Sequence, residues 1–147
     1  MNENQQMSKS WLNDPDLRQW IAAENAAIVD TSVSAAFVAY LSTLPWIGPH
    51  LDWQMLGGSS LSLADDLDAV AWARQRRIGR HPYALMVHAP SQPGLAASLE
   101  AVMGSIDFLV WKTPGAHYVC GCDSLDPVAP AFEDFVEYDG VEHLTGQ

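Results

Sequence analysis

Potential metal ligands are densest at one place in the sequence, where His117, Cys120, Cys122 and Asp123 lie close together. An imidazole and two thiolates can hold a soft metal ion. Zinc sites generally use a wider cysteine spacing and a second ligand pair, which is not visible here. Alternation along a strand places both cysteines on one face, where free cysteine packs as a small apolar side chain. We therefore expect buried thiols and no metal, since a disulfide between these two cysteines would be strained.

A glycine-rich run, Gly57-Gly58-Ser59-Ser60, precedes a predicted helix. Backbone N–H groups at such a place can hold a phosphate. No lysine follows as in a P-loop, and the acids at 65, 66 and 68 would repel an anion. The run is therefore interpreted as an ordinary turn before a helix N-cap.

Four of the seven basic residues are Arg74, Arg76, Arg77 and Arg80. They are a candidate anion site. However, the same predicted helix begins with acids and ends with these bases, which is the order that the helix dipole favours. A structural role is the preferred interpretation, and it includes anchoring the acidic C-terminal segment from inside the protein.

The five histidines are scattered, and the sequence has no H-E-x-x-H, G-x-S-x-G or G-x-G-x-x-G motif. We expect most of the histidines in loops or at the surface, with no catalytic residue, no cofactor and no enzyme activity. Catalytic triads are defined by geometry, so one alternative stays open. It is an enzyme or small-ligand site assembled from His81, His88, Asp107 and His117.

The C-terminal segment combines carboxylates with aromatic residues. Residues 123–147 carry seven acids and no Lys or Arg. Such a segment suits recognition of a basic partner, because aromatics supply contact area and carboxylates supply steering. The alternative is a hairpin or helix with one core face and one solvated acidic face. The predicted partner-binding residues are Asp126, Glu133, Asp134, Glu137, Tyr138, Asp139 and Glu142. Trp46, Trp53 and Tyr138 are candidate hydrophobic anchors.

The overall charge agrees with this interpretation. Eighteen acids face seven bases, which gives a formal net charge of -11 over 147 residues. Nucleic acid and anionic membranes would be repelled by such a field. A basic protein partner fits, although an acidic surface also simply favours solubility. The polar N-terminus, the absence of a long apolar stretch and the presence of only two cysteines predict a cytoplasmic protein.

We therefore expect an acidic inhibitor that binds a basic protein and blocks its cleft. The partner would be a toxin, or an enzyme that acts on nucleic acids or nucleotides. Bacterial immunity proteins are often similar in size and charge. This is an analogy with a type of protein, and no sequence motif supports it. A further alternative is an assembly or scaffold subunit, and the chain is expected to be a monomer or a homodimer.

The elements that would position these residues predict an α+β fold. Residues 1–12 are expected to be a flexible segment and 13–147 a single globular domain. A helix over 14–27 and a second helix between Asp30 and Pro45 are expected to form an antiparallel pair. A small, mostly antiparallel sheet with two further helices would follow.

Within that sheet, Asp52–Leu56 and Tyr83–His88 are predicted strands. A helix is predicted from Ser62 to about Arg77, and another from 91–94 through Ile106. Asp107–Trp111 and His117–Gly121 are predicted to form a hairpin turned by Pro114-Gly115. The C-terminal end is predicted as a hairpin of 134–138 with 141–144, or as a short helix over 129–137.

Overall fold

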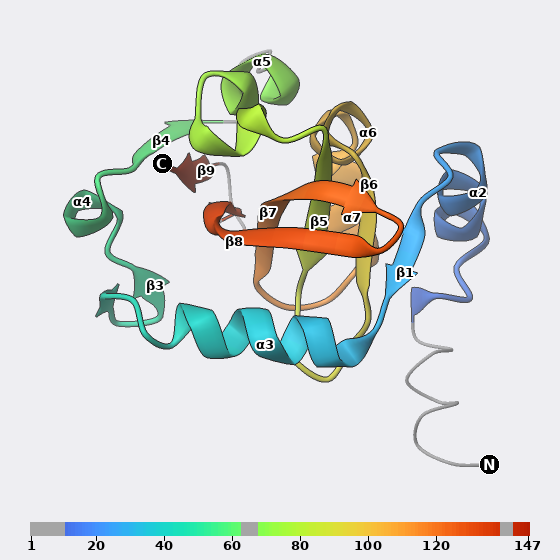
Figure 1. The fold of residues 1–147 in the computed structure, drawn as a ribbon, viewed down its shortest axis with the longest axis horizontal. Helices are drawn as coiled ribbons and strands as arrows, with labels where there is room; N and C mark the ends of the chain where they lie inside the picture. Colours follow the sequence, from blue (N-terminus) through green and yellow to red (C-terminus); the bar gives the residue numbers. More distant parts are fainter. Residues whose placement is uncertain (1–10, 63–67, 139–142) are drawn as a thin grey trace.

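Seven antiparallel strands form one sheet in the order β1-β6-β5-β7-β8-β9-β4 (Figure 1). The computed structural model describes residues 11–62, 68–138 and 143–147. The strands of the sheet are β1 Ala27–Val29, β4 Ser59–Ser62, β5 Tyr83–Val87, β6 Gly94–Ser98, β7 His117–Leu125, β8 Val128–Tyr138 and β9 His143–Gly146. A separate hairpin pairs β2 (Trp46–Ile47) with β3 (His50–Leu51). The predicted α+β class is confirmed, but the sheet is not small.

Helices cover both faces of this sheet. They are α2 Pro15–Ala23, α3 Thr31–Leu41, α4 Trp53–Leu56, α5 Ala69–Arg74, α6 Leu99–Gly104 and α7 Ile106–Lys112, with a 3-10 turn η1 at Arg77–Arg80. Side chains of α2, α5, α6 and α7 pack in one core layer, and those of α3 and α4 pack in the other. No helix in the described ranges has both the length and the apolar character needed to cross a membrane.

Strand β5 shows how one segment serves both core layers. Ala84 and Met86 pack against α5 and α6, while Leu85 and Val87 pack against α3. This alternation follows from the pleat of a strand, which sends successive side chains to opposite faces. A strand that is apolar at every position therefore indicates a sheet covered on both sides. The predicted strand over Tyr83–His88 is confirmed.

The N-terminal helices do not form the predicted pair. α2 ends at Ala23, and Asn25 adopts a left-handed conformation with φ of 53°. Asparagine tolerates this region better than most residues and often ends a helix. The chain then continues as β1, so the prediction of helix through residue 27 was too long. α2 and α3 lie on opposite faces of the sheet, with Leu17 in one core layer and Phe37 in the other.

Two predicted strands are helices. Residues 53–56 form α4, which begins after Asp52, whose carboxylate accepts a hydrogen bond from the Met55 N–H, and ends at the left-handed Gly57. Residues 106–112 form α7, so the predicted strand 107–111 and its hairpin with His117–Gly121 were wrong. Strand β7 pairs with β5 and β8 instead.

The reverse error occurs before α6. Residues 94–98 form β6 in the interior of the sheet, where a helix was predicted. The helix begins only at Leu99, after Ser98 accepts a hydrogen bond from the Ala101 N–H. Its sequence, GLAAS, contains one glycine and two alanines, which are depleted in strands. Tertiary packing therefore decides its conformation.

At the C-terminus, the predicted hairpin is confirmed in type, because β8 pairs antiparallel with β9, and the alternative helix over 129–137 was wrong. The predicted turn at Asp139-Gly140 and the predicted helix start at 63–67 lie outside the described residues. α5 begins after Asp68, which caps it. At the N-terminal end of the described chain, Trp11 is already buried in the core.

Candidate functional site

The predicted acidic recognition surface is divided by the fold. Asp126 and Glu133 are exposed and Tyr138 is half-buried, whereas Asp134 and Glu137 are buried. The other two predicted partner-binding residues, Asp139 and Glu142, lie outside the described residues. The segment therefore does not present one continuous acidic face, and its two buried carboxylates contact groups within the protein.

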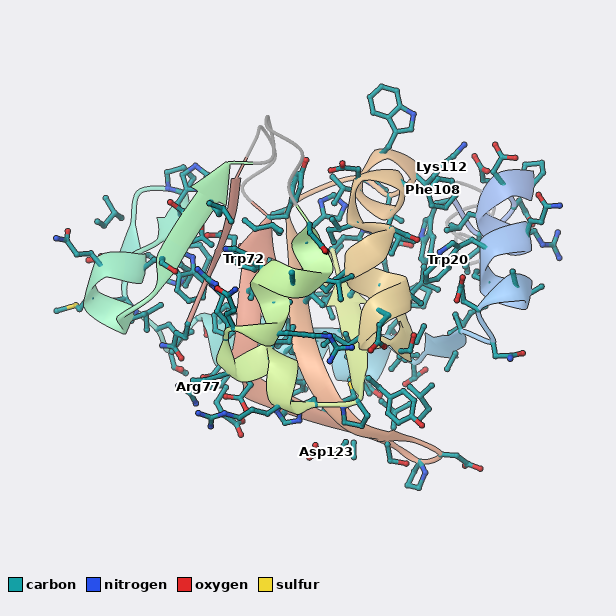
Figure 2. The ribbon with its side chains drawn as sticks, turned by 90° about the horizontal axis from the view of Figure 1, so that it is seen from above. Trp20, Trp72, Arg77, Phe108, Lys112 and Asp123 are labelled. Carbon is teal, nitrogen blue, oxygen red and sulfur yellow. The ribbon has the colours of Figure 1, made fainter. Side chains whose placement is uncertain are left out.

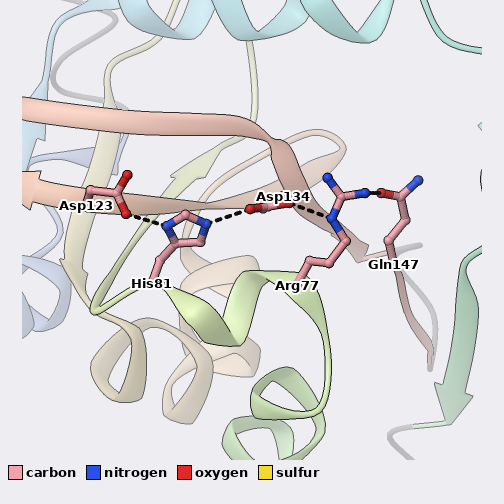
Figure 3. A network of polar contacts seen from close by, with 5 residues as sticks. All are labelled: Arg77, His81, Asp123, Asp134 and Gln147. Atoms are coloured by element: carbon pink, nitrogen blue, oxygen red, sulfur yellow. Dashed lines mark hydrogen bonds and ion pairs between the residues drawn. The ribbon is translucent and has the colours of Figure 1, made fainter.

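Asp134 is the centre of a polar network between η1 and the β7–β8 hairpin (Figure 3). Its Oδ1 atom lies 2.7 Å from Nε of Arg77, and its Oδ2 atom lies 2.7 Å from Nε2 of His81. Nδ1 of His81 in turn lies 2.6 Å from Oδ1 of Asp123. The Arg77 guanidinium also donates to the side chain of Gln147. The predicted internal anchoring of the acidic segment by an arginine is confirmed here.

Glu137 is held on the opposite face of the sheet. Its Oε1 atom accepts a hydrogen bond of 2.9 Å from the indole N–H of Trp53, and both side chains are buried. Burial, together with the Glu137 charge, raises the pKa of the Tyr118 hydroxyl well above its usual value. Trp53 therefore supports a buried carboxylate and is not an exposed anchor.

Removing that indole donor should destabilise the fold. We expect Trp53→Phe to lower the free energy of unfolding by about 1–3 kcal/mol, because a buried charged acceptor loses a partner. Urea denaturation followed by circular dichroism measures the change. The double variant Trp53→Phe/Glu137→Gln should recover part of the loss, since it also removes the charge. A single variant as stable as the wild-type chain would contradict this role for Trp53.

Two histidines are buried, His88 in the loop after β5 and His117 at the start of β7, whereas most histidines were expected in loops or at the surface. Nδ1 of His88 donates to the Pro114 carbonyl, and Nε2 of His117 donates to the Thr113 carbonyl. Their rings stack with centroids 6.0 Å apart, and the Trp11 ring meets His88 edge-on. Burial lowers the pKa of His88, and it lowers the pKa of His117 to about 4. Both imidazoles are therefore neutral at pH 7.

The suspected metal ligands are separated by the sheet. Cys120 and Cys122 are free thiols that pack on the α3 face, as predicted from strand alternation. His117 is on the same strand, but its side chain points to the opposite face of the sheet, where its Nε2 atom donates to the Thr113 carbonyl. Among the described residues, no group of three or more His, Cys, Asp or Glu side chains has the geometry to hold a metal ion.

Most described cations serve internal contacts. Arg74 pairs with Glu100, and the Arg76 guanidinium lies 4.1 Å from the Trp72 ring centroid. Lys112 reaches from α7 towards α2 (Figure 2), where its Nζ atom lies 2.9 Å from Oδ2 of Asp14. These arginines and this lysine tie elements together, which agrees with the structural interpretation of the arginine cluster.

The remaining acidic charge is spread over the described surface. Apart from the helix-capping Asp30 and Asp68, four exposed carboxylates form no ion pair among the described residues: Glu24, Asp107, Asp126 and Glu133. They lie at the end of α2, on α7, in the β7–β8 turn and on β8. Within the described ranges, this arrangement produces a general negative field and no single acidic patch.

An apolar hollow of about 480 Å³ lies between α3, the β2–β3 hairpin and the ends of β5 and β7. Its lining is Val38, Leu41, Ser42, Trp46, Val87, His88, Ala89, Pro90, Ala116 and Tyr118. The Trp46 indole donates to the Leu41 carbonyl at 3.0 Å, which fixes this wall. Trp46 is 38% exposed and the adjacent Ile47 is 64% exposed.

Of the three candidate anchors, only Trp46 lines this hollow. No sequence pattern predicted the hollow itself, because its lining comes from separate segments of the chain. The sequence matches no protein-family model and no curated protein. Chemically, the hollow can accept an apolar side chain, and the acidic surface around the molecule can attract a positively charged protein.

Proposed function

We propose that this chain is an acidic inhibitor-type protein that binds a basic partner protein and blocks its cleft. The contact is centred on the apolar hollow beside Trp46 and Ile47, and the negative field steers the partner to it. The occupant of the hollow is an apolar side chain of that partner. This placement replaces the C-terminal acidic segment as the contact site.

The observation that carries the proposal is the partly exposed Trp46, which lines an apolar hollow and is followed in the chain by the exposed Ile47. Large apolar side chains in a fixed concave setting are typical of binding hot spots, in which tryptophan is enriched. The hydrogen bond from Trp46 to Leu41 reduces the entropy that binding would otherwise remove. Net charge supports fast, salt-sensitive association with a basic protein.

The alternative site of scattered histidines has less support from the geometry. His81 lies in the network with Asp134, while His88 and His117 stack beneath Trp11. Asp107 is exposed on α7. Both ring nitrogens of His81 contact carboxylates, so this imidazole has no free nitrogen with which to act as a base.

Capture of a partner from extracts of the native host, followed by mass spectrometry, tests the proposal. We expect a basic protein to be recovered at low salt and lost as salt rises. Trp46→Ala should weaken binding of the purified partner by about tenfold or more, because it removes a large apolar side chain that lines the hollow. Calorimetric titration measures the change.

Trp111→Ala is the matched control, because Trp111 is 85% exposed on α7 and does not line the hollow. This variant should bind as the wild-type chain does. Recovery of no basic protein at low salt would overturn the proposal. A partner whose affinity is unchanged by Trp46→Ala would overturn the placement of the contact. Light scattering on the free chain identifies the case in which a second copy covers the hollow.

A further inference from the structure

We propose that His81 is a protonation-controlled latch: as an imidazolium it fastens the β7–β8 hairpin to η1, and loss of its proton releases the hairpin at Asp123. The latch is independent of the proposed partner. It follows from the positions of three side chains: His81, which directly follows η1, Asp123 on β7 and Asp134 on β8 (Figure 3).

The geometry requires a charged ring. Oxygen atoms of two carboxylates lie 2.6 Å from Nδ1 and 2.7 Å from Nε2 of His81. An ionised carboxylate only accepts hydrogen bonds, and a neutral imidazole has only one N–H donor. Both contacts are satisfied together when each ring nitrogen carries a proton, which is the imidazolium form.

The surroundings of the ring favour this charge. Burial opposes it, but the hydrogen bonds to Asp134 and Asp123 outweigh burial and raise the pKa of His81. The other charged or titratable groups near the ring are the Arg77 guanidinium, which shares Asp134, and the Cys122 thiol on β7. The ring also packs directly over the backbone of Gly121, where an added Cβ would overlap its Cδ2 atom.

The two arms of the latch are unequal. The Asp134 side chain is 11% exposed and keeps the Arg77 guanidinium as a second partner. The Asp123 side chain is 67% exposed, so water can replace His81 there at little cost. A neutral ring retains one N–H donor. That donor stays with Asp134, because a buried carboxylate without a partner costs more free energy than an exposed one. Deprotonation therefore opens the Asp123 arm and leaves the Asp134 arm closed.

Nitrogen-15 NMR of the histidine rings between pH 5 and 9 tests the latch. We expect the titration midpoint of His81 to lie above the ordinary value of 6.5, with both ring nitrogens carrying protons at pH values well below that midpoint. The backbone amide signals of Asp123 and Ser124 should move with the same midpoint. In His81→Gln these amide shifts should no longer depend on pH over that range.

Asp123→Asn should lower the His81 midpoint by about one pH unit, because it removes an opposite charge. Asp126→Asn, which removes another exposed acid of the same turn, should leave the midpoint nearly unchanged. A His81 titration midpoint at or below 6.5 would overturn the proposal. So would amide signals at Asp123 that do not follow His81, and this last measurement needs only the wild-type chain.

Discussion

Phe37→Ala is expected to lower the free energy of unfolding by about 3–5 kcal/mol. Phe37 has no exposed surface and lies at the centre of an aromatic cluster. Its ring centroid lies 5.2 Å from that of Phe132, 5.8 Å from that of Phe135 and 6.0 Å from that of Tyr118. Alanine would leave a cavity that helix and strands cannot both close.

This loss is large relative to the stability of about 5–15 kcal/mol that is usual for one domain. Urea denaturation by circular dichroism measures it, and Phe37→Leu provides a smaller change if the alanine variant does not fold. Ala35→Ser, at an exposed position of the same helix, should change stability by about 0.5 kcal/mol or less. A loss below about 1 kcal/mol for Phe37→Ala would show that α3 does not cover the sheet in solution.

The helix that carries Phe37 was predictable because local signals agreed with the fold. Asp30 caps it, and Phe37 and Leu41 are buried one turn apart as the helical period requires. The helix α7 lacked such agreement. Its residues 107–111 favour a strand by composition, yet Ile106 and Leu109 are buried while Trp111 points to solvent. Contact with the sheet, which no local pattern encodes, decides that segment.

The burial of two predicted partner-binding residues, Asp134 and Glu137, has a related cause. An acidic strand was expected to have one solvated face, as is common in antiparallel sheets. Here helices cover both faces, so alternation along β8 sends Asp134 towards η1 and Glu137 towards Trp53. Either orientation buries a carboxylate. Sequence spacing identified the alternation, but it contained no information on whether the second face would be covered.

Because helices cover both faces of the sheet, His117 is also buried. The second large expected effect is therefore a fall in the free energy of unfolding at acid pH. His117 is buried in a neutral form, and its pKa falls from 6.5 to about 4 because burial disfavours the charge. In the unfolded chain the imidazole regains its ordinary pKa. The unfolded state therefore binds a proton that the folded state excludes at any pH between these two values.

The direction of the effect follows from this difference. Stability due to neutral His117 is complete above pH 6.5 and is lost as the pH falls towards 4. One pH unit corresponds to about 1.4 kcal/mol for one proton, so the total loss is about 3 kcal/mol. His88, whose pKa is also lowered by burial, adds to the loss in the same range. Urea denaturation at pH 7 and pH 5 measures the first part of this loss, which is about 2 kcal/mol for His117.

The variant His117→Gln isolates this contribution. Glutamine can still donate to the Thr113 carbonyl but cannot be protonated, so the difference in stability between pH 7 and pH 5 should shrink. His50→Gln, which replaces an exposed imidazole of β3, should keep the wild-type difference. An unchanged pH dependence in His117→Gln would show that this imidazole is not held neutral.

His81 adds a second contribution to the pH dependence of stability, and this contribution is lost at alkaline rather than at acid pH. Because the pKa of His81 is raised in the folded state, its contribution is complete below pH 6.5 and is lost as the pH rises through the folded pKa. Stability should therefore be greatest just above pH 6.5, between the two losses. His81→Gln should remove only the loss at alkaline pH and His117→Gln only part of the loss at acid pH. The two residues have no shared partner among the described contacts, so their effects should add.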